Sequence, residues 1–391
     1  MMRKCAAVFL FLASLSLAQV KPATQTLPSV PAARLAHIRH GINLSEWFAQ
    51  VYDPKGYTKE HFETWTTASD IALIKSTGFD HVRLSVNPQP MMDAARHPNG
   101  TAEYFGYLDA AVKMILDAGL AVELDMHPDS DFKARLAKED DFVERFADFW
   151  STVAQHYASW DKDRVFFEIL NEPEMRDPYR WYGVEAKLAA AVRRAAPANT
   201  IIATGANWDN DDDLLFLEPL PDPNVIYVFH FYEPHIFTHQ GATWGAYYWH
   251  WLKGLHYPSS PENAAQVAEL VPEARERLQV IRYGQDHWEA SHIEAEINQA
   301  ADWGKQRGVP LICNEFGVFR NFTDPQDRAA WIKDVRTSLE RHNIGWAMWD
   351  YSGSFGVVTN RETKATLDEV TVRALGLKMP TGQQFCEILR C

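Results

Sequence analysis

Two short segments of the sequence each end a run of apolar residues with an asparagine and a glutamate. They are FFEILNEP, which contains Asn171 and Glu172, and LICNEFG, which contains Glu315. A pair of carboxyl groups can cleave a glycosidic bond, because one acid protonates the departing oxygen while the other carboxylate attacks the anomeric carbon or activates water. A single glutamate at a strand end is often only solvated or paired with a cation. Since both segments have the same form, we favour a catalytic pair.

The separation of the two carboxyl groups would decide the stereochemistry of such a reaction. A gap of about 5–5.5 Å gives retention through a covalent sugar–enzyme intermediate, whereas a wider gap gives inversion. Two carboxylates this close repel each other, so we expect one to keep its proton near neutral pH while the other is ionised.

Apolar runs alternate with helical patterns along the chain and indicate how these residues are positioned. We predict strands at His37–Asn43, His81–Val86, Ala121–Met126, Val165–Leu170, Thr200–Thr204, Val225–Phe231, Pro310–Asn314 and Ile344–Met348. We predict helices at Ala68–Ser76, Tyr104–Ala118, Asp141–Ser159, Tyr182–Ala195, Gln285–Gln306 and Gln326–His342. Asp324 followed by Pro325 is typical of a helix start, and Gly308 stands where a glycine is favoured after a helix.

Eight short buried strands, most of them separated by helices, predict an α/β fold of the (β/α)8 TIM-barrel type, in one domain over residues 37–377. A doubly wound sheet would normally open with a glycine-rich phosphate turn, and none follows the first predicted strand. Residues 233–284, after the sixth strand, are rich in Trp and Tyr. We interpret them as an insertion on the catalytic face rather than a second domain.

Active sites of such barrels lie at the C-terminal ends of the strands. Most of the predicted strand ends carry a polar or large aromatic residue: Asn43, Arg83, His127, Asn171 with Glu172, His230 with Tyr232, Glu315, and Trp349. We therefore expect these side chains to converge on one pocket.

Composition limits the classes of partner. The chain has 391 residues, of which 46% are hydrophobic, as expected of a globular protein with a full core. Its formal net charge of -14 disfavours binding to nucleic acid or acidic membranes. Flat aromatic faces suit sugar rings, and Trp47, Trp208 and Trp244 are candidates for stacking on them. The acidic run 209–213 lacks the spaced ligands of a calcium loop, so we expect a solvated loop.

The N-terminus has the pattern of a secretory signal. A basic start is followed by an apolar stretch and by small residues suited to cleavage after Ala18, and the stretch is too short to span a bilayer. We therefore expect a secreted or periplasmic protein with no membrane attachment once residues 1–18 are removed. Residues 19–36, rich in Pro, Ala and Thr, are predicted to be an extended leader, and 378–391 a C-terminal tail.

The cysteines leave several arrangements open. Cys5 lies in the signal, and Cys386 and Cys391 are close enough in sequence to form a small local loop in an oxidising compartment. Cys313 lies in an apolar run and is expected to be buried. The sequence does not decide which of the three mature cysteines stays unpaired.

The order and spacing of these motifs resemble family 5 of the glycoside hydrolases, which are retaining glycosidases built on a (β/α)8 barrel. The resemblance extends over nearly the whole mature chain, from HGINLSEWF (40–48) to WAMWDYSGSFGV (346–357). It includes ILNEP, ICNEFG, the VRL at 82–84 and the HFY at 230–232. The resemblance implies that Glu172 is the general acid/base and Glu315 the nucleophile. Asn171 would bind the sugar 2-hydroxyl, a contact that strengthens in the transition state.

The resemblance also implies roles for the supporting residues. Arg83 would lie beneath the nucleophile and keep it ionised and oriented, and Tyr232 would donate its hydroxyl to the same carboxylate. His127 and His230 would line the cleft near the reacting sugar, and Trp349 would form the platform under it.

The preferred function is therefore an endo-acting β-1,4-glucanase, a cellulase-like enzyme without a metal or other cofactor, acting on β-glucan or a related polysaccharide. A monomer is the default expectation. A β-mannanase, an exo-β-glucosidase or a transglycosylase would use the same chemistry. A metal-dependent barrel hydrolase using His127 and His230 is disfavoured, because no H-x-H pair stands at a strand end. A non-catalytic sugar-binding barrel would need neither glutamate.

Overall fold

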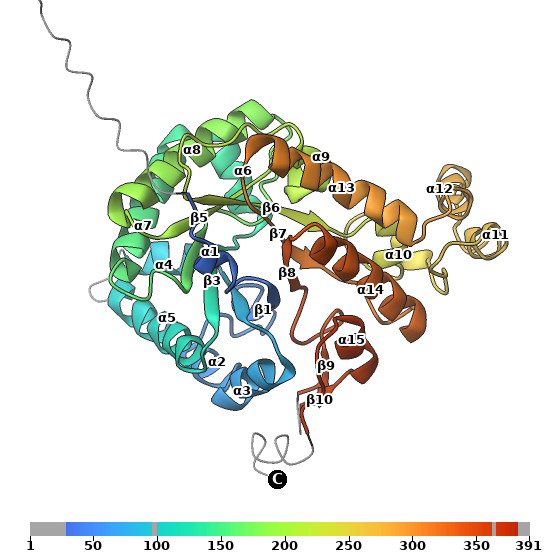
Figure 1. The fold of residues 1–391 in the computed structure, drawn as a ribbon, viewed down its shortest axis with the longest axis horizontal. Coiled ribbons are helices and arrows are strands. Elements are labelled where there is room, and N and C mark those ends of the chain that lie inside the picture. Colours follow the sequence, from blue (N-terminus) through green and yellow to red (C-terminus); the bar gives the residue numbers. More distant parts are fainter. Residues whose placement is uncertain (1–28, 96–99, 362–364, 382–391) are drawn as a thin grey trace, which may run out of the picture.

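Eight parallel strands close in chain order into a barrel at the centre of the molecule (Figure 1). The computed structural model describes residues 29–95, 100–361 and 365–381 of the chain. The strands are β1 (His40–Phe48), β2 (His81–Val86), β3 (Ala121–Met126), β4 (Val165–Glu168), β5 (Thr200–Thr204), β6 (Val225–Phe231), β7 (Leu311–Phe316) and β8 (Gly345–Met348). The predicted (β/α)8 barrel is confirmed.

Helices between the strands form the outer layer of the barrel (Figure 1). They are α2 (Lys59–Thr64), α3 (Ala68–Thr77), α4 (Pro88–Ala94), α5 (Gly100–Asp117), α6 (Ser130–Lys138), α7 (Asp140–Tyr157), α8 (Pro178–Ala195), η1 (Asn207–Asp209), α9 (Asp211–Leu214), α13 (Ala290–Arg307), α14 (Pro325–Arg341) and α15 (Glu369–Ala374). Asp324 caps α14 as predicted, since its carboxylate accepts from the backbone N–H groups of Gln326 and Asp327. Gly308 ends α13 at a φ of 66°, a conformation that glycine adopts without strain.

The segment after β6 stands out from the barrel on one side, where Figure 1 shows α11 and α12 beyond the ring of helices. Its elements are α10 (His235–Thr238), η2 (Trp249–Trp251), α11 (Pro261–Ala268) and α12 (Ala274–Gln285). After β8, a small hairpin of β9 (Val358–Asn360) and β10 (Thr366–Leu367) precedes α15. No helix in the described part of the chain is long and apolar enough to span a bilayer.

The N-terminal end of the barrel is closed by apolar side chains. They form one buried cluster of Val30, Ile38, Ala121, Phe166, Ile202, Ile226, Val228 and Ile312. The preceding residues contribute to this closure: Ala32–Leu35 form α1, and the buried Arg34 donates hydrogen bonds to Asp163 and Thr200. The prediction that residues 19–36 are an extended leader is therefore wrong for residues 32–35, because a buried arginine with several partners fixes them against the barrel.

A polar layer lies above the apolar one inside the barrel. Successive side chains of a strand point to opposite faces, so Glu168, two residues after Phe166, also points inward. Asn314 Nδ2 donates to Glu123 Oε1 at 2.8 Å and to Glu168 Oε2 at 3.0 Å, and all three residues are fully buried. Burial, and then the negative charge of Glu168, raise the pKa of Glu123 well above its usual range.

A β-bulge in β7 lets two consecutive residues face the barrel interior. The register between β6 and β7 shifts, so that Phe229 is opposite Cys313 while His230 is opposite Glu315. Asn314 is the extra residue, and bulges of this kind re-aim side chains next to active sites. Glu315 consequently lies inside β7 rather than after it, which corrects the predicted strand end at Asn314 and places Glu315 over the polar layer.

The N- and C-terminal predictions fall mostly outside the described residues. The signal at 1–18, Cys5, Cys386 and Cys391 all lie there. Cys313 is buried, as predicted, and it is a free cysteine. Its sulfur lies 3.4 Å from the carbonyl oxygen of Glu315.

Glu185→Gln is expected to stabilise the protein increasingly as the pH rises. Glu185 is fully buried on α8 and accepts a hydrogen bond from the Thr204 backbone N–H at 2.6 Å. Burial raises its pKa to about 8 from a usual value of 4.5. Because the pKa of Glu185 is higher in the folded than in the unfolded protein, its contribution to the free energy of unfolding is complete below pH 4.5. This contribution is lost as the pH rises to about 8, by up to about 1.4 kcal/mol per pH unit.

Thermal melts of both proteins between pH 4 and 9 test this prediction. The Tm of the glutamine variant minus that of the wild type should grow between pH 4.5 and about 8 and then level off. Glu218→Gln, at a carboxylate 78% exposed, is the control and should show no such trend. A difference that stays constant with pH would contradict the prediction.

Candidate active site

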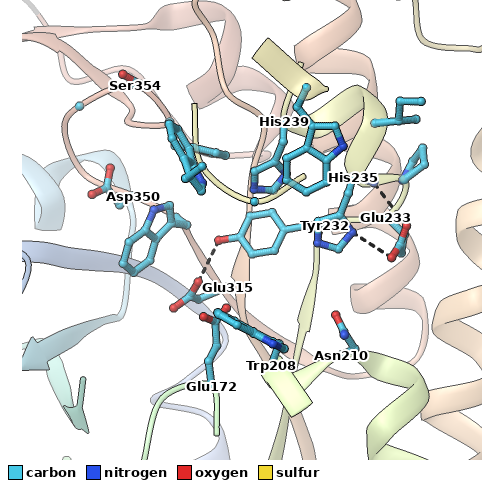
Figure 2. Close-up of a pocket in the computed structure, with 18 of the residues that line it drawn as sticks. Glu172, Trp208, Asn210, Tyr232, Glu233, His235, His239, Glu315, Asp350 and Ser354 are labelled. Atoms are coloured by element: carbon cyan, nitrogen blue, oxygen red, sulfur yellow. Dashed lines mark hydrogen bonds and ion pairs between the residues drawn. The ribbon is translucent and has the colours of Figure 1, made fainter. Parts of the chain in front are cut away.

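A pocket of about 1250 Å³ opens at the C-terminal end of the barrel strands. Glu172, Glu315 and Trp349 line its centre, and Trp208 and Trp244 line its walls. Figure 2 shows Glu172 and Glu315 side by side, with Trp208 close to Glu172 and Tyr232 above Glu315. The pocket extends toward the insertion, which supplies His235, His239, Tyr248, Trp249, Gln279, Arg282 and Tyr283. The predicted position of the insertion on this face is confirmed.

Both oxygens of the Glu315 carboxylate accept hydrogen bonds. Arg83 Nη1 donates to Oε1 at 2.6 Å. The Tyr232 hydroxyl donates to Oε2 at 2.9 Å (Figure 2). Burial, together with the charges of Glu315 and Glu172, raises the pKa of Tyr232 well above its usual range, so this phenol stays a donor. Only 4% of Glu315 is exposed. The contacts therefore fix its orientation and stabilise its negative charge.

Arg83 is the central cation of the site. It lies in the middle of β2, not at a strand end as predicted, and it is fully buried. Its guanidinium binds Glu168 through two hydrogen bonds of 2.7 Å and lies 3.1 Å from Asp125. Burial alone would lower the pKa of Arg83, but the charges of Asp125, Glu168 and Glu315 outweigh this effect and hold the pKa well above its usual value. Arg83 is thus a permanent cation beneath the nucleophile.

Two asparagines complete the shell of Arg83. Asn43 accepts from Arg83 Nη1 at 3.0 Å, and its amide donates to the carbonyl oxygens of Asn314 and Met348. It lies within β1 and is fully buried, so it positions Arg83 rather than lining the pocket, which corrects its predicted place at a strand end. Asn171 follows β4 and accepts from Arg83 Nη2 at 2.9 Å. Its Oδ1 is thereby fixed as the acceptor, which leaves its NH2 group as the donor for a ligand.

Glu172 projects from the loop after β4. Its side chain is 23% exposed, and Oε1 lies 3.1 Å from His230 Nδ1. Its backbone is in the left-handed region at a φ of 43°, which costs a residue other than glycine on the order of 1–2 kcal/mol. The backbone N–H is bound by Asp209 Oδ2 at 2.7 Å.

The two glutamates face each other across a short gap. A carboxylate oxygen of Glu172 and one of Glu315 lie within 4.8 Å of each other. This spacing is that of a retaining glycosidase and leaves no room for the intervening water of an inverting one. Glu315 is deep and held by a cation, whereas Glu172 is nearer the opening, which matches the places of a nucleophile and an acid/base.

The two histidines predicted to belong to the site, His127 and His230, are neutral. Burial lowers the pKa of His127 to about 3 and that of His230 to about 4. His127 Nδ1 bonds Asp125 Oδ2 at 2.8 Å, and its Nε2 lies 3.1 Å from the Gln50 amide. The His127 ring lies parallel to Trp349, with centroids 5.7 Å apart. His127 lines the pocket, whereas His230 is not among the lining residues and contacts Glu172 instead.

Comparison with known proteins assigns the family. A sequence model of the cellulase family, glycosyl hydrolase family 5, matches residues 45–354. The chain belongs to this family. It is 28% identical to Endoglucanase C of Acetivibrio thermocellus over 86% of this chain and 97% of that protein. It is 26% identical to Cellodextrinase A of Ruminococcus flavefaciens over 78% of this chain and 82% of that protein.

Solved structures agree with this assignment. The structure of an endoglucanase from the hyperthermophilic Thermotoga maritima superimposes with a TM-score of 0.70 at 25% identity, over 88% of this chain and 98% of that one. The predicted resemblance to family 5 is therefore confirmed.

The three tryptophans proposed to stack on sugar have different surroundings in this cellulase-family protein. Trp208 and Trp244 line the pocket and are 45% and 49% exposed, so both can present a ring face to a ligand. Trp47 is only 2% exposed, and its indole N–H donates to the carbonyl oxygen of Phe62. Trp47 is a core residue, and its predicted role in sugar stacking is wrong.

The acidic run 209–213 is not a solvated loop, as was expected. Asp209 is fully buried and Asp211 is 8% exposed, because the run folds back against β6 as η1 and α9. Its first carboxyl group binds the backbone of Glu172 instead of water. This contact depends on how two loops meet, so no local sequence pattern predicts it.

Sequence reasoning also missed Glu168 and Asp125, which hold Arg83 and His127. A signal was available: both strands are completely buried, yet β3 contains two acidic residues, Glu123 and Asp125, and β4 ends on Glu168. Buried carboxylates need partners, and the one arginine in β2 could have been matched to them.

Among the described residues, Glu172, His230 and Glu315 form the one cluster whose donor atoms could hold a metal ion. Their atoms are already engaged: Arg83 and Tyr232 bind the two oxygens of Glu315, and His230 Nδ1 contacts Glu172. This arrangement favours acid–base and nucleophilic chemistry by the two glutamates.

Proposed function

We propose that the protein is a retaining endo-β-1,4-glucanase in which Glu172 is the acid/base and Glu315 the nucleophile. The observation that carries this proposal is the pair of carboxyl groups within 4.8 Å at the floor of an aromatic-walled pocket. Membership in the cellulase family and similarity to Endoglucanase C over almost its entire length support the choice of substrate.

In the first step, Glu315 attacks the anomeric carbon of the sugar while Glu172 gives its proton to the departing glycosidic oxygen. The C–O bond to the leaving sugar breaks, and a glycosyl ester forms on Glu315. Arg83 and Tyr232 hold the attacking carboxylate in place before the reaction, so little reorganisation is needed in the transition state. The free NH2 group of Asn171 is placed to bind the sugar 2-hydroxyl as positive charge develops on the ring.

In the second step, Glu172 acts as a base. It takes a proton from water, whose oxygen attacks the anomeric carbon from the side the leaving group vacated, and Glu315 departs as a carboxylate. Arg83 stabilises the released anion. Two inversions give net retention of the β configuration.

A product profile identifies the substrate. The protein is incubated with soluble β-1,4-glucan, β-mannan and xyloglucan, and the first anomer released is followed by NMR. The proposal predicts rapid cleavage of β-1,4-glucan into several oligosaccharide lengths, with the β-anomer appearing first. Release of the α-anomer first, or release of single end units, would contradict retention or endo action respectively.

A mannan substrate is the second candidate. Structures of the Thermotoga maritima protein exist in complex with mannotriose and, for a mutant form, in complex with cellobiose. Preferential cleavage of β-mannan in the same panel would favour this alternative. Unchanged activity after exhaustive chelation would exclude a metal-dependent hydrolase. The signal predicted at residues 1–18 supports action outside the cytoplasm, where such polymers occur.

A further inference from the structure

The loops after β4 and β5 are joined by three hydrogen bonds. The backbone N–H of Trp208 donates to the Pro173 carbonyl at 3.0 Å, and that of Asn207 donates to the Met175 carbonyl at 3.3 Å. The third bond runs the other way, from the Glu172 backbone N–H to Asp209 Oδ2 at 2.7 Å. Glu172 and Trp208 therefore lie on two loops that are hydrogen-bonded to each other.

The residues at this junction have an unusual backbone. Glu172, Asn207, Trp208 and Asp209 all have positive φ angles, of 43°, 25°, 71° and 54°, and none is a glycine. Such conformations persist where surrounding contacts hold them, and they cluster at functional sites. At Glu172 the Asp209 carboxyl group supplies that contact. It binds the N–H of the residue whose side chain must reach the glycosidic oxygen.

Asp209 also lies behind the histidine that contacts Glu172. His230 Nδ1 is 3.1 Å from Glu172 Oε1, and its Nε2 is 3.9 Å from Asp209 Oδ2. Both Asp209 Oδ1 and His230 Nε2 are buried without a hydrogen-bond partner in the described part of the chain. Asp209 is thus hydrogen-bonded to the backbone of Glu172, and it also lies near the histidine that contacts the Glu172 side chain.

We propose that Asp209 is a positioning residue for the acid/base Glu172, acting as a buried hydrogen-bond acceptor that fixes the left-handed backbone at that position. The inference rests on the proposed role of Glu172. It extends that role to Asp209, a buried residue that is not among those lining the pocket.

The surroundings of Asp209 indicate that a neutral group serves this purpose. The groups facing it are Glu172, Glu168, Thr204 and His230. Burial, and then the charges of Glu172 and Glu168, raise the pKa of Asp209 well above its usual range. An asparagine at position 209 is neutral and keeps an acceptor oxygen at the same distance from the backbone, so it should preserve the function of Asp209. An alanine has no acceptor and should not preserve it.

The test compares leaving groups. The substrates are the phenyl and 2,4-dinitrophenyl β-glycosides of the disaccharide that the product panel identifies, which is cellobiose under the proposed function. Phenol departs only with help from an acid, whereas dinitrophenolate departs without it. We expect Asp209→Ala to lower kcat/KM for the phenyl glycoside by roughly 100-fold and for the dinitrophenyl glycoside by less than about threefold. Asp209→Asn should stay within about threefold of wild type on both substrates.

Three controls separate positioning from folding. Asp211→Ala, in the same acidic run but without contact to Glu172, should leave the leaving-group dependence unchanged. Glu172→Ala sets the full size of the selective loss. Melting temperatures are recorded for every variant, and Asp209→Ser, whose hydroxyl is too short to reach the Glu172 N–H, replaces the alanine variant if that chain does not fold.

Each outcome decides the proposal. The proposal is supported if Asp209→Ala loses kcat/KM selectively on the phenyl glycoside and Asp209→Asn does not. Equal losses on the two substrates, no loss, or an asparagine variant as impaired as the alanine one would overturn it. If Glu172→Ala itself shows no leaving-group selectivity, the proposed function of Glu172 fails, and the inference fails with it.

Discussion

Glu315→Ala is expected to lower kcat on soluble β-1,4-glucan by on the order of 10⁵-fold, because it removes the group that forms the covalent intermediate. The fold should persist, since Arg83 keeps its two hydrogen bonds to Glu168 when Glu315 is gone. Added azide can enter the space that the carboxylate leaves and attack the anomeric carbon from the same side. The product would then be an α-glycosyl azide, detected by NMR, with an activated aryl glycoside as the substrate.

Glu185→Gln is the matched control for this experiment, because Glu185 is also a fully buried glutamate but lies on α8, away from the pocket. It should keep the wild-type kcat. A Glu315→Ala protein that retains activity within tenfold of wild type, or that gives a β-glycosyl azide, would contradict the assignment of Glu315 as nucleophile.

Glu172→Ala is expected to lower kcat/KM on the polysaccharide by roughly 10³-fold, within the usual contribution of a general acid. The covalent intermediate still forms from an activated aryl glycoside, but its hydrolysis lacks a base, so the intermediate accumulates and KM falls. Azide needs no base and attacks the intermediate from the side opposite Glu315. It should raise kcat and yield a β-glycosyl azide, the anomer opposite to the one expected for Glu315→Ala.

The two azide products test the role of Glu172 and the role of Glu315 independently of each other. If Glu172 were only a structural residue, its alanine variant would be impaired equally on activated and unactivated substrates, and azide would have no effect. Exchange of the two anomers between the variants would mean that the acid/base and nucleophile roles are reversed.

The sequence was sufficient to predict the barrel because its strands are short, apolar and separated by amphipathic segments. Four strands, β2, β3, β5 and β6, have the predicted bounds. The strands β1 and β7 extend further than predicted, since polar residues such as Asn43 and Glu315 were interpreted as marking strand ends. Inside a barrel, a polar residue can remain in a strand when it finds buried partners, as Asn43 and Glu315 both do with Arg83.

The two glutamates and their immediate neighbours could be found from motifs, because each motif is a short continuous segment that ends an apolar run. The partners that hold them could not. Glu168 and Arg83 are 85 positions apart, and Asp209 binds a backbone group 37 positions away. Such contacts follow from the closure of the barrel and from loop conformation. For the same reason Trp47 was misassigned: its indole is turned to the core by a hydrogen bond to Phe62.

Labelling of the nucleophile is the most direct measurement of whether the carboxyl groups at positions 172 and 315 divide the reaction between them. The wild-type protein is inactivated with a 2-deoxy-2-fluoro-β-cellobioside that carries a dinitrophenolate leaving group, digested, and mapped by mass spectrometry. We predict one fluorocellobiosyl group per chain, attached to the peptide that contains Glu315, and none on Glu315→Ala. A label on another residue, or turnover that leaves the protein unlabelled and releases the α-anomer, would contradict the account.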